Sequence, residues 1–303
     1  MDELHPSYNN RILWMDKRDH LLRMRIEYPP SLAGQVKPGQ FLALGLANYE
    51  RMLPNYPLQE MSEAKRKRLV KRPYSISHPI LNEGGELILD EPDFLEFYIS
   101  LVQPPVSSES KVPQFTPRLF CLDSGFPIHA NPRVAGDYLL DIHEKTQRIF
   151  FFSTGTGEAP HNAMIHSLLL AGFKGDIFHL VCNPTMDHFL YYDIYRSLEF
   201  LFPNFHYFPL SRESRTFRGE VQRFQGLISQ GLLESEFGLS LECESDEVFL
   251  CGNPSMIGTP KKSRDSGRLV YPEKTGLVEL FMKRGFSHSS EKCTGNIHYE
   301  SYW

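Results

Sequence analysis

The sequence lacks long apolar runs, paired cysteines and an excess of positive charge. Its apolar runs fall short of the ~20 residues that a membrane-spanning helix needs, and residues 1–10 lack the charged-then-apolar pattern of a signal peptide. The five cysteines are odd in number and form no Cys-x-x-Cys pair, which argues against a disulfide framework, a zinc site or an iron–sulfur cluster within the chain. We therefore expect a cytoplasmic protein without a membrane span or a metal ion.

The composition is that of a folded, slightly acidic protein. The net charge of −5 provides no general positive field for a nucleic-acid partner. Hydrophobic residues make up 41% of the chain and charged residues 23%, which excludes an intrinsically disordered chain. With 303 residues, the chain is long enough for two domains of ordinary size.

The first half of the sequence predicts a β-rich domain. Short apolar stretches are separated by turn-forming segments such as Val36–Gly39 and Asn82–Gly85, a pattern typical of a closed barrel or a sandwich. The character of the sequence changes near Glu144–Arg148, so we place the two domains at residues 1–145 and 146–303. The strands expected in the first domain are residues 11–15, 21–28, 40–46, 73–77, 95–102 and 138–142.

The second half alternates strands with helices. Such alternation predicts a doubly wound parallel sheet, which binds ligands beyond the carboxyl ends of its strands. The turns at Thr154 and Cys251 follow two of these expected strands. The expected strands are residues 149–152, 177–181, 205–210 and 247–250, and the expected helices lie around residues 164–169, 187–202, 221–233 and 276–284.

The segment Lys71–Ser77 is the most informative part of the first half. It combines a fixed cation, a rigid aromatic ring and two hydroxyls in one short β-prone run. Such a strand can place the Arg72 guanidinium on a phosphate, lay the Tyr74 ring along a flat cofactor and direct the Ser75 hydroxyl at a ring nitrogen.

The second half carries three further motifs, and the chain closes on an aromatic sequence. Ser153–Pro160 is a strand-to-helix turn in which glycines allow close backbone approach and the helix N-terminus favours a negative charge. Ser211–Glu213 follows a strand and offers an arginine, whose planar fork suits a phosphate. Cys251–Met256 joins a small thiol to a glycine that leaves room for a flat ring, and His298–Trp303 ends the chain with three aromatic rings.

Taken in this order, these motifs resemble those of the ferredoxin–NADP reductase family, bacterial type, over nearly the whole chain. The resemblance implies an N-terminal antiparallel β-barrel that binds FAD and a C-terminal α/β domain, with a doubly wound parallel sheet, that binds NADP. It also implies a ferredoxin–NADP⁺ reductase activity, in which hydride passes between NADP(H) and FAD and single electrons pass between FAD and ferredoxin or flavodoxin.

For FAD, the resemblance assigns Arg72 to the pyrophosphate, Tyr74 and Tyr302 to the flavin faces, and Ser75 to the neighbourhood of flavin N5. Thr116 would close on the pyrophosphate, although Gln114 stands where the family usually has glycine. The complete implied set is Arg72, Pro73, Tyr74, Ser75, Tyr98, Ile99, Thr116, Tyr302 and Trp303.

For NADP, the resemblance implies that Ser211 and Arg212 grip the 2′-phosphate and that Cys251 lies against the nicotinamide. The sequence departs from the family at Glu158, where an apolar residue is common. It also has Thr185 and Glu220 where bacterial relatives carry arginines, and Arg215 and Arg218 lie close enough to substitute. The implied NADP set is Thr154, Gly155, Thr156, Gly157, Ser211, Arg212, Cys251, Gly252 and Met256, and the implied catalytic set is Ser75, Cys251, Glu300 and Tyr302.

A basic run, Lys65–Lys71, directly precedes the flavin motif. It is either a solvated surface or a patch that steers an acidic electron carrier such as ferredoxin or flavodoxin. Two other functions stay open: a reductase that passes electrons to an oxygenase or to free flavin, and a non-catalytic FAD-binding subunit of a larger assembly.

Overall fold

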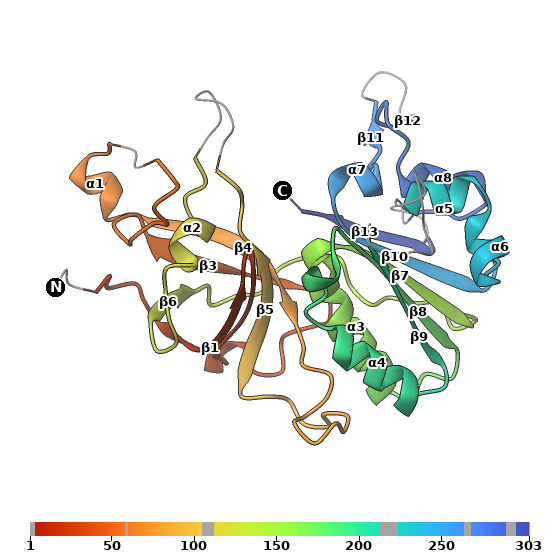
Figure 1. Cartoon of the computed structure of the whole chain (residues 1–303), viewed down its shortest axis with the longest axis horizontal. Coiled ribbons are helices and arrows are strands. Elements are labelled where there is room, and N and C mark those ends of the chain that lie inside the picture. The colour runs from red at the N-terminus through yellow and green to blue at the C-terminus, as the bar shows by residue number, and fades with distance from the viewer. Residues whose placement is uncertain are drawn as a thin grey trace. The chain divides into compact units, whose positions relative to one another are not determined.

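The computed structural model describes residues 4–57, 60–104, 112–211, 224–263, 268–288 and 295–302. These residues form two compact units, drawn in Figure 1. The barrel unit contains Met1–Pro79 and Ile88–Leu139, and the sheet unit contains Ile80–Leu87 and Leu140–Trp303. The domain boundary between residues 145 and 146 stays a prediction.

The barrel unit is a closed antiparallel barrel of six strands. Its order is β1-β2-β5-β4-β3-β6, so the last strand closes on the first. Leucine, isoleucine and phenylalanine side chains fill its interior, among them Leu44, Ile76 and Phe97, all buried. The strands are β1 Asn10–Arg18, β2 Leu21–Glu27, β3 Phe41–Ala47, β4 Leu69–Ser77, β5 Phe94–Ser100 and β6 Pro127–Ala130, with short helices η1 Pro30–Leu32, α1 Glu63–Arg66 and α2 Thr116–Leu119.

The predicted barrel is confirmed, but its last strand is not where the sequence placed it. Residues 138–142 form no strand, whereas β6 is built from Pro127–Ala130. β6 pairs through Asn10↔Ile128 on one side and Leu44↔Ala130 on the other. A four-residue strand that begins with proline and contains a histidine has too little apolar alternation to be recognised from sequence.

The sheet unit is a five-stranded parallel sheet in the order β13-β10-β7-β8-β9. This confirms the predicted doubly wound α/β fold. Its strands are β7 Arg148–Thr154, β8 Asp176–Asn183, β9 Phe205–Ser211, β10 Asp246–Gly252 and β13 Ile297–Ser301, and a small ribbon pairs β11 Lys261–Lys262 with β12 Leu269–Val270. The sequence did not predict β13, whose pattern of alternating polar residues resembles an exposed tail.

Helices cover both faces of this sheet (Figure 1). The helices are η2 Gly155–Gly157, α3 Glu158–Leu170, η3 Met186–His188, α4 Tyr192–Leu201, α5 Phe224–Ser229, α6 Leu232–Phe237, α7 Pro254–Ile257 and α8 Leu277–Lys283. Phe150 and Phe152 of β7 point to the face covered by α5 and α8, where Phe152 meets Phe224 and Phe281 and Phe150 stacks on Phe178. Phe151 points to the α3 and α4 face, so β7 is buried on both sides.

The two faces differ in polarity. The α5–α8 face is almost entirely apolar. The α3–α4 face buries Ser153, His161, Asn162 and His179 beside tyrosines from α4 and β9. Buried polar side chains require partners, so this face holds a hydrogen-bond network.

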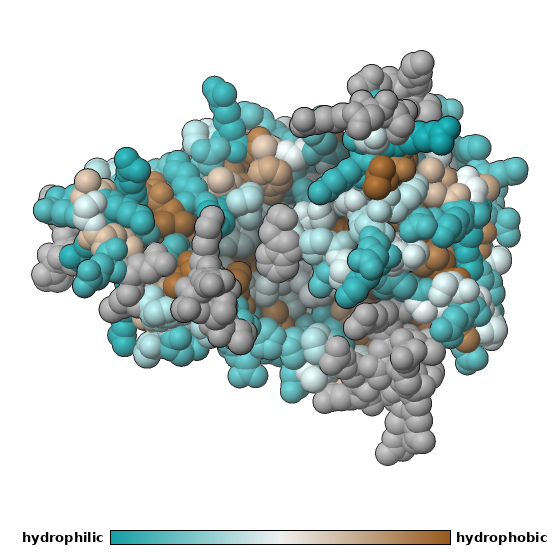
Figure 2. All heavy atoms as spheres, turned by 90° about the horizontal axis from the view of Figure 1, so that it is seen from above, coloured by the Kyte–Doolittle hydropathy of each residue, from teal (hydrophilic) through white to brown (hydrophobic). Residues whose placement is uncertain are grey.

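Hydrophilic side chains dominate the face shown in Figure 2, where apolar atoms show in small separate areas. Within the described residues, no helix has the length and apolar character needed to cross a bilayer.

Candidate functional site

The flavin motif lies where two barrel strands separate. Strand β4 is nine residues long, yet it pairs with β5 only through Ile76↔Phe97 and Ser77↔Glu96 among the described residues. The preceding residues, Arg72–Ser75, pair with β3 on the other side. The β5-facing edge of this stretch therefore carries no ladder partner from β5 among the described residues.

The ring of Tyr74 and the start of α2 lie side by side in the barrel unit. The rings of Tyr74 and Phe115 have centroids 5.5 Å apart. Thr116 begins α2, and its Oγ1 accepts a hydrogen bond from the Val102 backbone N–H at 3.1 Å. The structure thus brings together two of the predicted FAD residues, Tyr74 and Thr116, from segments about 40 residues apart in the chain.

The other predicted FAD residues of the barrel unit differ in exposure. Arg72 and Pro73 are exposed, and the Arg72 guanidinium donates to the Lys71 carbonyl at 3.0 Å. Ser75 and Tyr98 are buried, and the Ile99 side chain belongs to the barrel core. Ile99 could therefore meet a cofactor only through its backbone.

The carboxyl end of the parallel sheet forms a tightly packed glycine cradle, which we define as Thr154–Gly157 together with Cys251 and Gly252. A Cβ atom on Gly157 would lie 2.2 Å from the Cys251 carbonyl oxygen. Gly252 has φ of +129°, and a Cβ there would lie 2.3 Å from Thr154 Oγ1. Only glycine fits at these two positions, because side chains would collide with backbone that has nowhere to move.

The thiol of Cys251 lies inside this cradle and is fully buried. Burial raises its pKa well above the ordinary value, and the charge of Glu300 adds to the increase, while hydrogen bonding from Tyr302 and Gly252 opposes it. The thiol is therefore neutral, which suits a small packing group and not a nucleophile.

Strand β13 brings two more predicted residues to the cradle. Glu300 is the register partner of Cys251. The Tyr302 N–H donates to the Gly252 carbonyl at 3.2 Å, and its hydroxyl donates to the Thr156 carbonyl at 3.2 Å. The structure thus gathers three of the four predicted catalytic residues, Cys251, Glu300 and Tyr302, in the sheet unit.

Asn253 closes the cradle on its other side. Its N–H donates to Thr154 Oγ1 at 2.8 Å, and its side chain caps α7 by accepting from the Ser255 N–H at 2.8 Å. Met256 of α7 points into the apolar core, so its side chain faces away from the cradle.

Of the two predicted 2′-phosphate residues, the structure describes Ser211, which lies apart from the cradle. Ser211 ends β9, at the edge of the sheet opposite β13, and its Oγ is buried without a hydrogen-bond partner in the described part of the chain. Arg212 and Trp303 fall outside the described residues, as do Arg215, Arg218 and Glu220.

A buried polar network lies behind the turn. The sequence motif contains Ser153, Gly155 and Glu158, but their partners Asn183, His161 and His179 were not predicted. The Gly155 N–H donates to Asn183 Oδ1 at 3.0 Å, and Asn183 Nδ2 lies 3.3 Å from Glu158 Oε1. Ser153 Oγ lies 2.6 Å from His161 Nδ1 and 3.3 Å from His179 Nε2. The sequence signal for this network was polar residues in an otherwise apolar stretch. His179 lies inside β8 and Asn183 ends it, and such residues predict buried hydrogen bonds.

Burial controls the protonation of this network. It lowers the pKa of His179 to about 3 and that of His161 well below its usual value, so both imidazoles are neutral. Burial raises the pKa of Glu158 to about 8, against the opposing hydrogen bonds of Asn183 and Tyr195.

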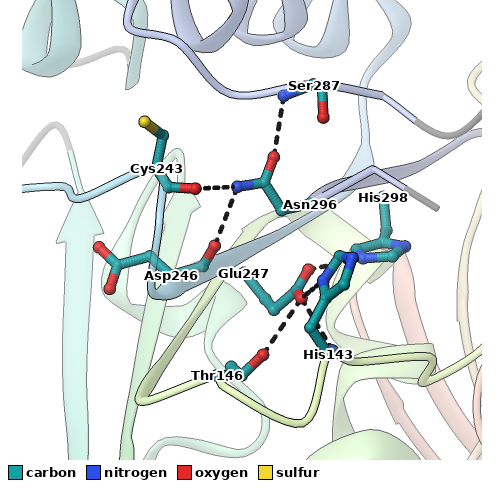
Figure 3. A network of polar contacts seen from close by, with 8 residues as sticks. All are labelled: His143, Thr146, Cys243, Asp246, Glu247, Ser287, Asn296 and His298. Atoms are coloured by element: carbon teal, nitrogen blue, oxygen red, sulfur yellow. Dashed lines mark hydrogen bonds and ion pairs between the residues drawn. The ribbon is translucent and has the colours of Figure 1, made fainter. Parts of the chain in front are cut away.

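The amino end of the same sheet holds a second polar network (Figure 3). The carboxylate of Glu247 accepts from the His143 N–H at 3.1 Å, from the His143 ring and from Thr146 Oγ1 at 3.2 Å, while His298 Nε2 lies 2.9 Å from its other oxygen. Nearby, Asn296 Nδ2 donates to the Cys243 carbonyl at 2.7 Å. Among the described residues, no three His, Cys, Asp or Glu side chains are arranged to hold a metal ion.

The basic run of the barrel unit is solvent-exposed. Lys65, Arg66, Lys67, Arg68 and Lys71 all lie on the surface. Lys67 pairs with Glu63 at 2.8 Å, one turn earlier on α1, and the structure gives the other four no carboxylate partner among the described residues.

The sheet unit matches a known family. Residues 151–262 match the family model described as an oxidoreductase NAD-binding domain. A curated relative, the flavodoxin/ferredoxin–NADP reductase of Escherichia coli (strain K12), is 28% identical over 185 residues, which cover 55% of this chain and 64% of the relative. The match therefore spans slightly less than two thirds of that relative's length.

Solved structures share the fold of the whole chain. A ferredoxin NADP⁺ reductase from Neisseria gonorrhoeae with bound FAD and NADP superposes with a TM-score of 0.68 at 19% identity, covering 98% of this chain and 99% of that one. The FAD/NAD-binding domain of nitric oxide dioxygenase from Vibrio cholerae superposes with a TM-score of 0.58 at 14% identity, covering 96% and 98%. Together with the motifs at Arg72, Gly155 and Cys251, these matches support the resemblance of the chain to the ferredoxin–NADP reductase family.

Proposed function

We propose that this protein is a flavin-dependent oxidoreductase that exchanges hydride with NADP(H) and single electrons with ferredoxin or flavodoxin. The observation that carries the proposal is the glycine cradle, in which Gly157 and Gly252 leave no room for side chains beside a neutral thiol. The cradle lies at the carboxyl ends of the strands, where doubly wound sheets bind their ligands. A nicotinamide held there would have to bring its reacting carbon to roughly 3–3.5 Å from the flavin for hydride transfer.

The barrel unit fits FAD. The Arg72 guanidinium is exposed and could pair with a pyrophosphate, and Thr116 offers a hydroxyl beside the Tyr74 ring. Ser75 would lie near the reacting nitrogen. When bound, FAD would supply the conversion of one hydride into two single electrons, which no side chain can perform.

The sheet unit fits the dinucleotide. The backbone of Gly155–Gly157 precedes the N-terminus of α3, whose dipole favours phosphate groups. Ser211, whose buried hydroxyl has no partner among the described residues, and Arg212 would hold the 2′-phosphate. Tyr302 would act as a gate, because its hydroxyl must leave the Thr156 carbonyl before its ring can move.

The exposed basic run would receive the electron carrier. Ferredoxin and flavodoxin are acidic, and a local positive patch accelerates the encounter of oppositely charged partners. Because glutathione keeps thiols reduced in the cytoplasm, the free cysteines Cys121, Cys182, Cys243 and Cys251 fit the cytoplasmic location we propose.

The visible spectrum of the purified protein tests the proposal. We expect flavin absorption, which anaerobic NADPH should bleach and purified ferredoxin should restore faster than free flavin does. Faster electron transfer to free flavin than to ferredoxin or flavodoxin would instead favour a flavin reductase. Flavin retained without any NADPH oxidation would indicate a non-catalytic subunit.

The Arg72→Ala variant tests the FAD site directly. One charge-assisted contact is worth roughly 1.5–3 kcal/mol, so the variant should lose FAD on dilution at least tenfold more readily than the wild type. Arg68→Ala, a neighbouring exposed cation, is the control and should retain FAD. Equal retention in both variants would place Arg72 outside the FAD site.

A further inference from the structure

A fully buried acid stands directly behind the nucleotide turn. Glu158 is the first residue of α3, follows Gly157 in the chain and has no exposed surface. Its Oε1 lies 3.3 Å from Asn183 Nδ2, a long hydrogen bond, and among the described residues its buried Oε2 has no hydrogen bond of good geometry. The Tyr195 hydroxyl gives the carboxyl only a weak further interaction. A buried carboxyl with so few donors is costly in its charged form.

Asn183 connects this acid to the turn itself. Its Oδ1 accepts the Gly155 N–H at 3.0 Å, while its Nδ2 also donates to the His188 carbonyl at 3.1 Å. Asn183 ends β8, so it ties the turn after β7 to the end of the neighbouring strand. The orientation of the Gly155 peptide therefore depends on a side chain that Glu158 contacts.

We infer that Glu158 and Asn183 are positioning residues for the nucleotide turn, and that the turn binds NADP(H) with Glu158 in its protonated, neutral form. This inference rests on the proposed function, because it concerns the same nucleotide site. The inference goes beyond the proposed function because it makes the affinity for NADP(H) depend on the proton of the buried Glu158 carboxyl.

The electrostatics follow from the position of the carboxyl. Ionisation of Glu158 places a full negative charge beneath the turn that faces the cofactor phosphates, in a region from which water is excluded, where charges interact strongly. An ionised carboxylate would also draw both Asn183 N–H groups toward itself, at the expense of the His188 contact. Both effects weaken phosphate binding.

The surroundings offer no compensating positive charge within the described residues. His161 and His179 are neutral because burial lowers their pKa values. Cys251 is a neutral thiol because burial raises its pKa. Titratable groups on the elements around Glu158 include His161 and His166 on α3, His179 and Cys182 on β8, Tyr191 and Tyr195 at α4, Tyr207 on β9, Cys251 on β10, and Asp187 and His188 on η3. The arginine of α4, Arg196, forms an ion pair with Glu199 at 2.5 Å. Because burial raises the pKa of Glu158 to about 8, its change of charge falls just above neutral pH.

Calorimetric titration of the FAD-loaded protein with NADP⁺ between pH 7 and 9.5 tests the inference. For the wild type we expect the Kd to rise about tenfold between pH 8 and 9.5, with proton uptake on binding that is visible as a dependence on buffer ionisation enthalpy. Glu158→Gln keeps the shape and the Asn183 contact without the titration, so its Kd should stay within about twofold over this range.

A matched control is Glu247→Gln, which changes a buried glutamate at the other end of the sheet. It should reproduce the wild-type pH dependence. Asn183→Ala should weaken NADP⁺ binding severalfold even at pH 7, because the Gly155 N–H loses its acceptor. Should Asn183→Ala fail to fold, the comparison of Glu158→Gln with the wild type decides alone.

The outcomes separate this inference from the proposed function. NADP⁺ binding with the same pH dependence in the wild type and Glu158→Gln would overturn the inference and leave the proposed function intact. Absence of NADP⁺ binding by the wild type at every pH would overturn both.

Discussion

The two ends of the five-stranded sheet each bury a glutamate, and the pKa values of these two carboxyls shift in opposite directions. Glu247, at the amino end, is met by donors from His143, Thr146 and His298 (Figure 3). Burial pushes its pKa upward, but the hydrogen bonds from His298 and His143 outweigh burial and leave the pKa below its ordinary value. Glu158, at the carboxyl end, has a long contact with Asn183 and a weak one with Tyr195, which do not outweigh burial, so that its pKa rises to about 8.

The remaining groups follow the same division. Beside Glu247, Asp246 receives two bonds from Arg148, both of 2.8 Å, so that all four carboxylate oxygens of these two residues have partners. At the carboxyl end, the Glu158 and Ser211 side chains retain unpartnered buried oxygens among the described residues. The hydrogen bonds at the amino end thus stabilise the unit, whereas the carboxyl end retains polar atoms that a ligand could hydrogen-bond or a proton could neutralise.

The largest expected effect is at the amino end. Glu247→Ala removes the acceptor shared by His143, Thr146 and His298, and breaking a buried ion pair on one side typically costs about 3–5 kcal/mol. We expect this loss in the free energy of unfolding, measured by urea titration at pH 7. Thr146→Ala, which removes one peripheral donor, should cost only about 1 kcal/mol. A loss below 1 kcal/mol for Glu247→Ala would show that the two ends do not differ in this way.

An intermediate effect is expected in the glycine cradle. Gly252→Ala places a Cβ 2.3 Å from Thr154 Oγ1 at a φ of +129°, and we expect a loss of about 1–3 kcal/mol from overpacking together with loss of NADP⁺ binding. Gly172→Ala is the control, since its φ is +68° but nothing lies within 4 Å. It should cost about 1 kcal/mol from strain and leave binding unchanged. Equal stability and equal binding in the two variants would refute the close packing of the cradle.

The smallest effect is a gain in stability at Glu158. The unfolded acid ionises near pH 4.5 and the folded acid near pH 8, so folded Glu158 retains a proton that the unfolded chain has released, and stability falls as the pH rises between these values. Glu158→Gln removes this loss. Each pKa unit corresponds to about 1.4 kcal/mol, and after the burial cost of the amide we expect a net gain of about 1–2 kcal/mol at pH 8. The gain should vanish at pH 5, and an equal gain at both pH values would exclude ionisation as its cause.

Much of the fold was predictable because its signals are local. The strands at Phe41–Ala47 and Arg148–Thr154 are short apolar runs bounded by turns. The glycines of Thr154–Gly157 predict the strand-to-helix turn that follows. β6 and β13 were missed, and residues 138–142 were wrongly predicted as a strand. Within that run only Tyr138 is buried, and residues 139–142 are partly or fully exposed and pair with no strand among the described residues, so an apolar run alone does not establish a strand.

The site was predictable only where a short motif contains it. Gly157 and Gly252 are recognisable within their motifs. The close approach of the turn after β7 to the end of β10 depends on the tertiary fold and cannot be predicted from either motif alone. The bond from the Gly155 N–H to Asn183 joins residues 28 apart in the chain. Nothing in the sequence around Glu158 tells whether its side chain faces solvent or the interior, and this orientation alone decides its protonation.

Strand β7, with Phe150, Phe151 and Phe152 fully buried in the middle of the sheet, also bears on how the protein must be produced. Its partners β8 and β10 lie about 30 and 100 residues further along the chain. Until β10 and the helices have folded onto it, β7 is an exposed, β-prone apolar segment that can pair with strands of other molecules. Arg148 is its single charged residue that opposes such aggregation. Slow synthesis at low temperature and dilute refolding therefore favour recovery of soluble protein over aggregation.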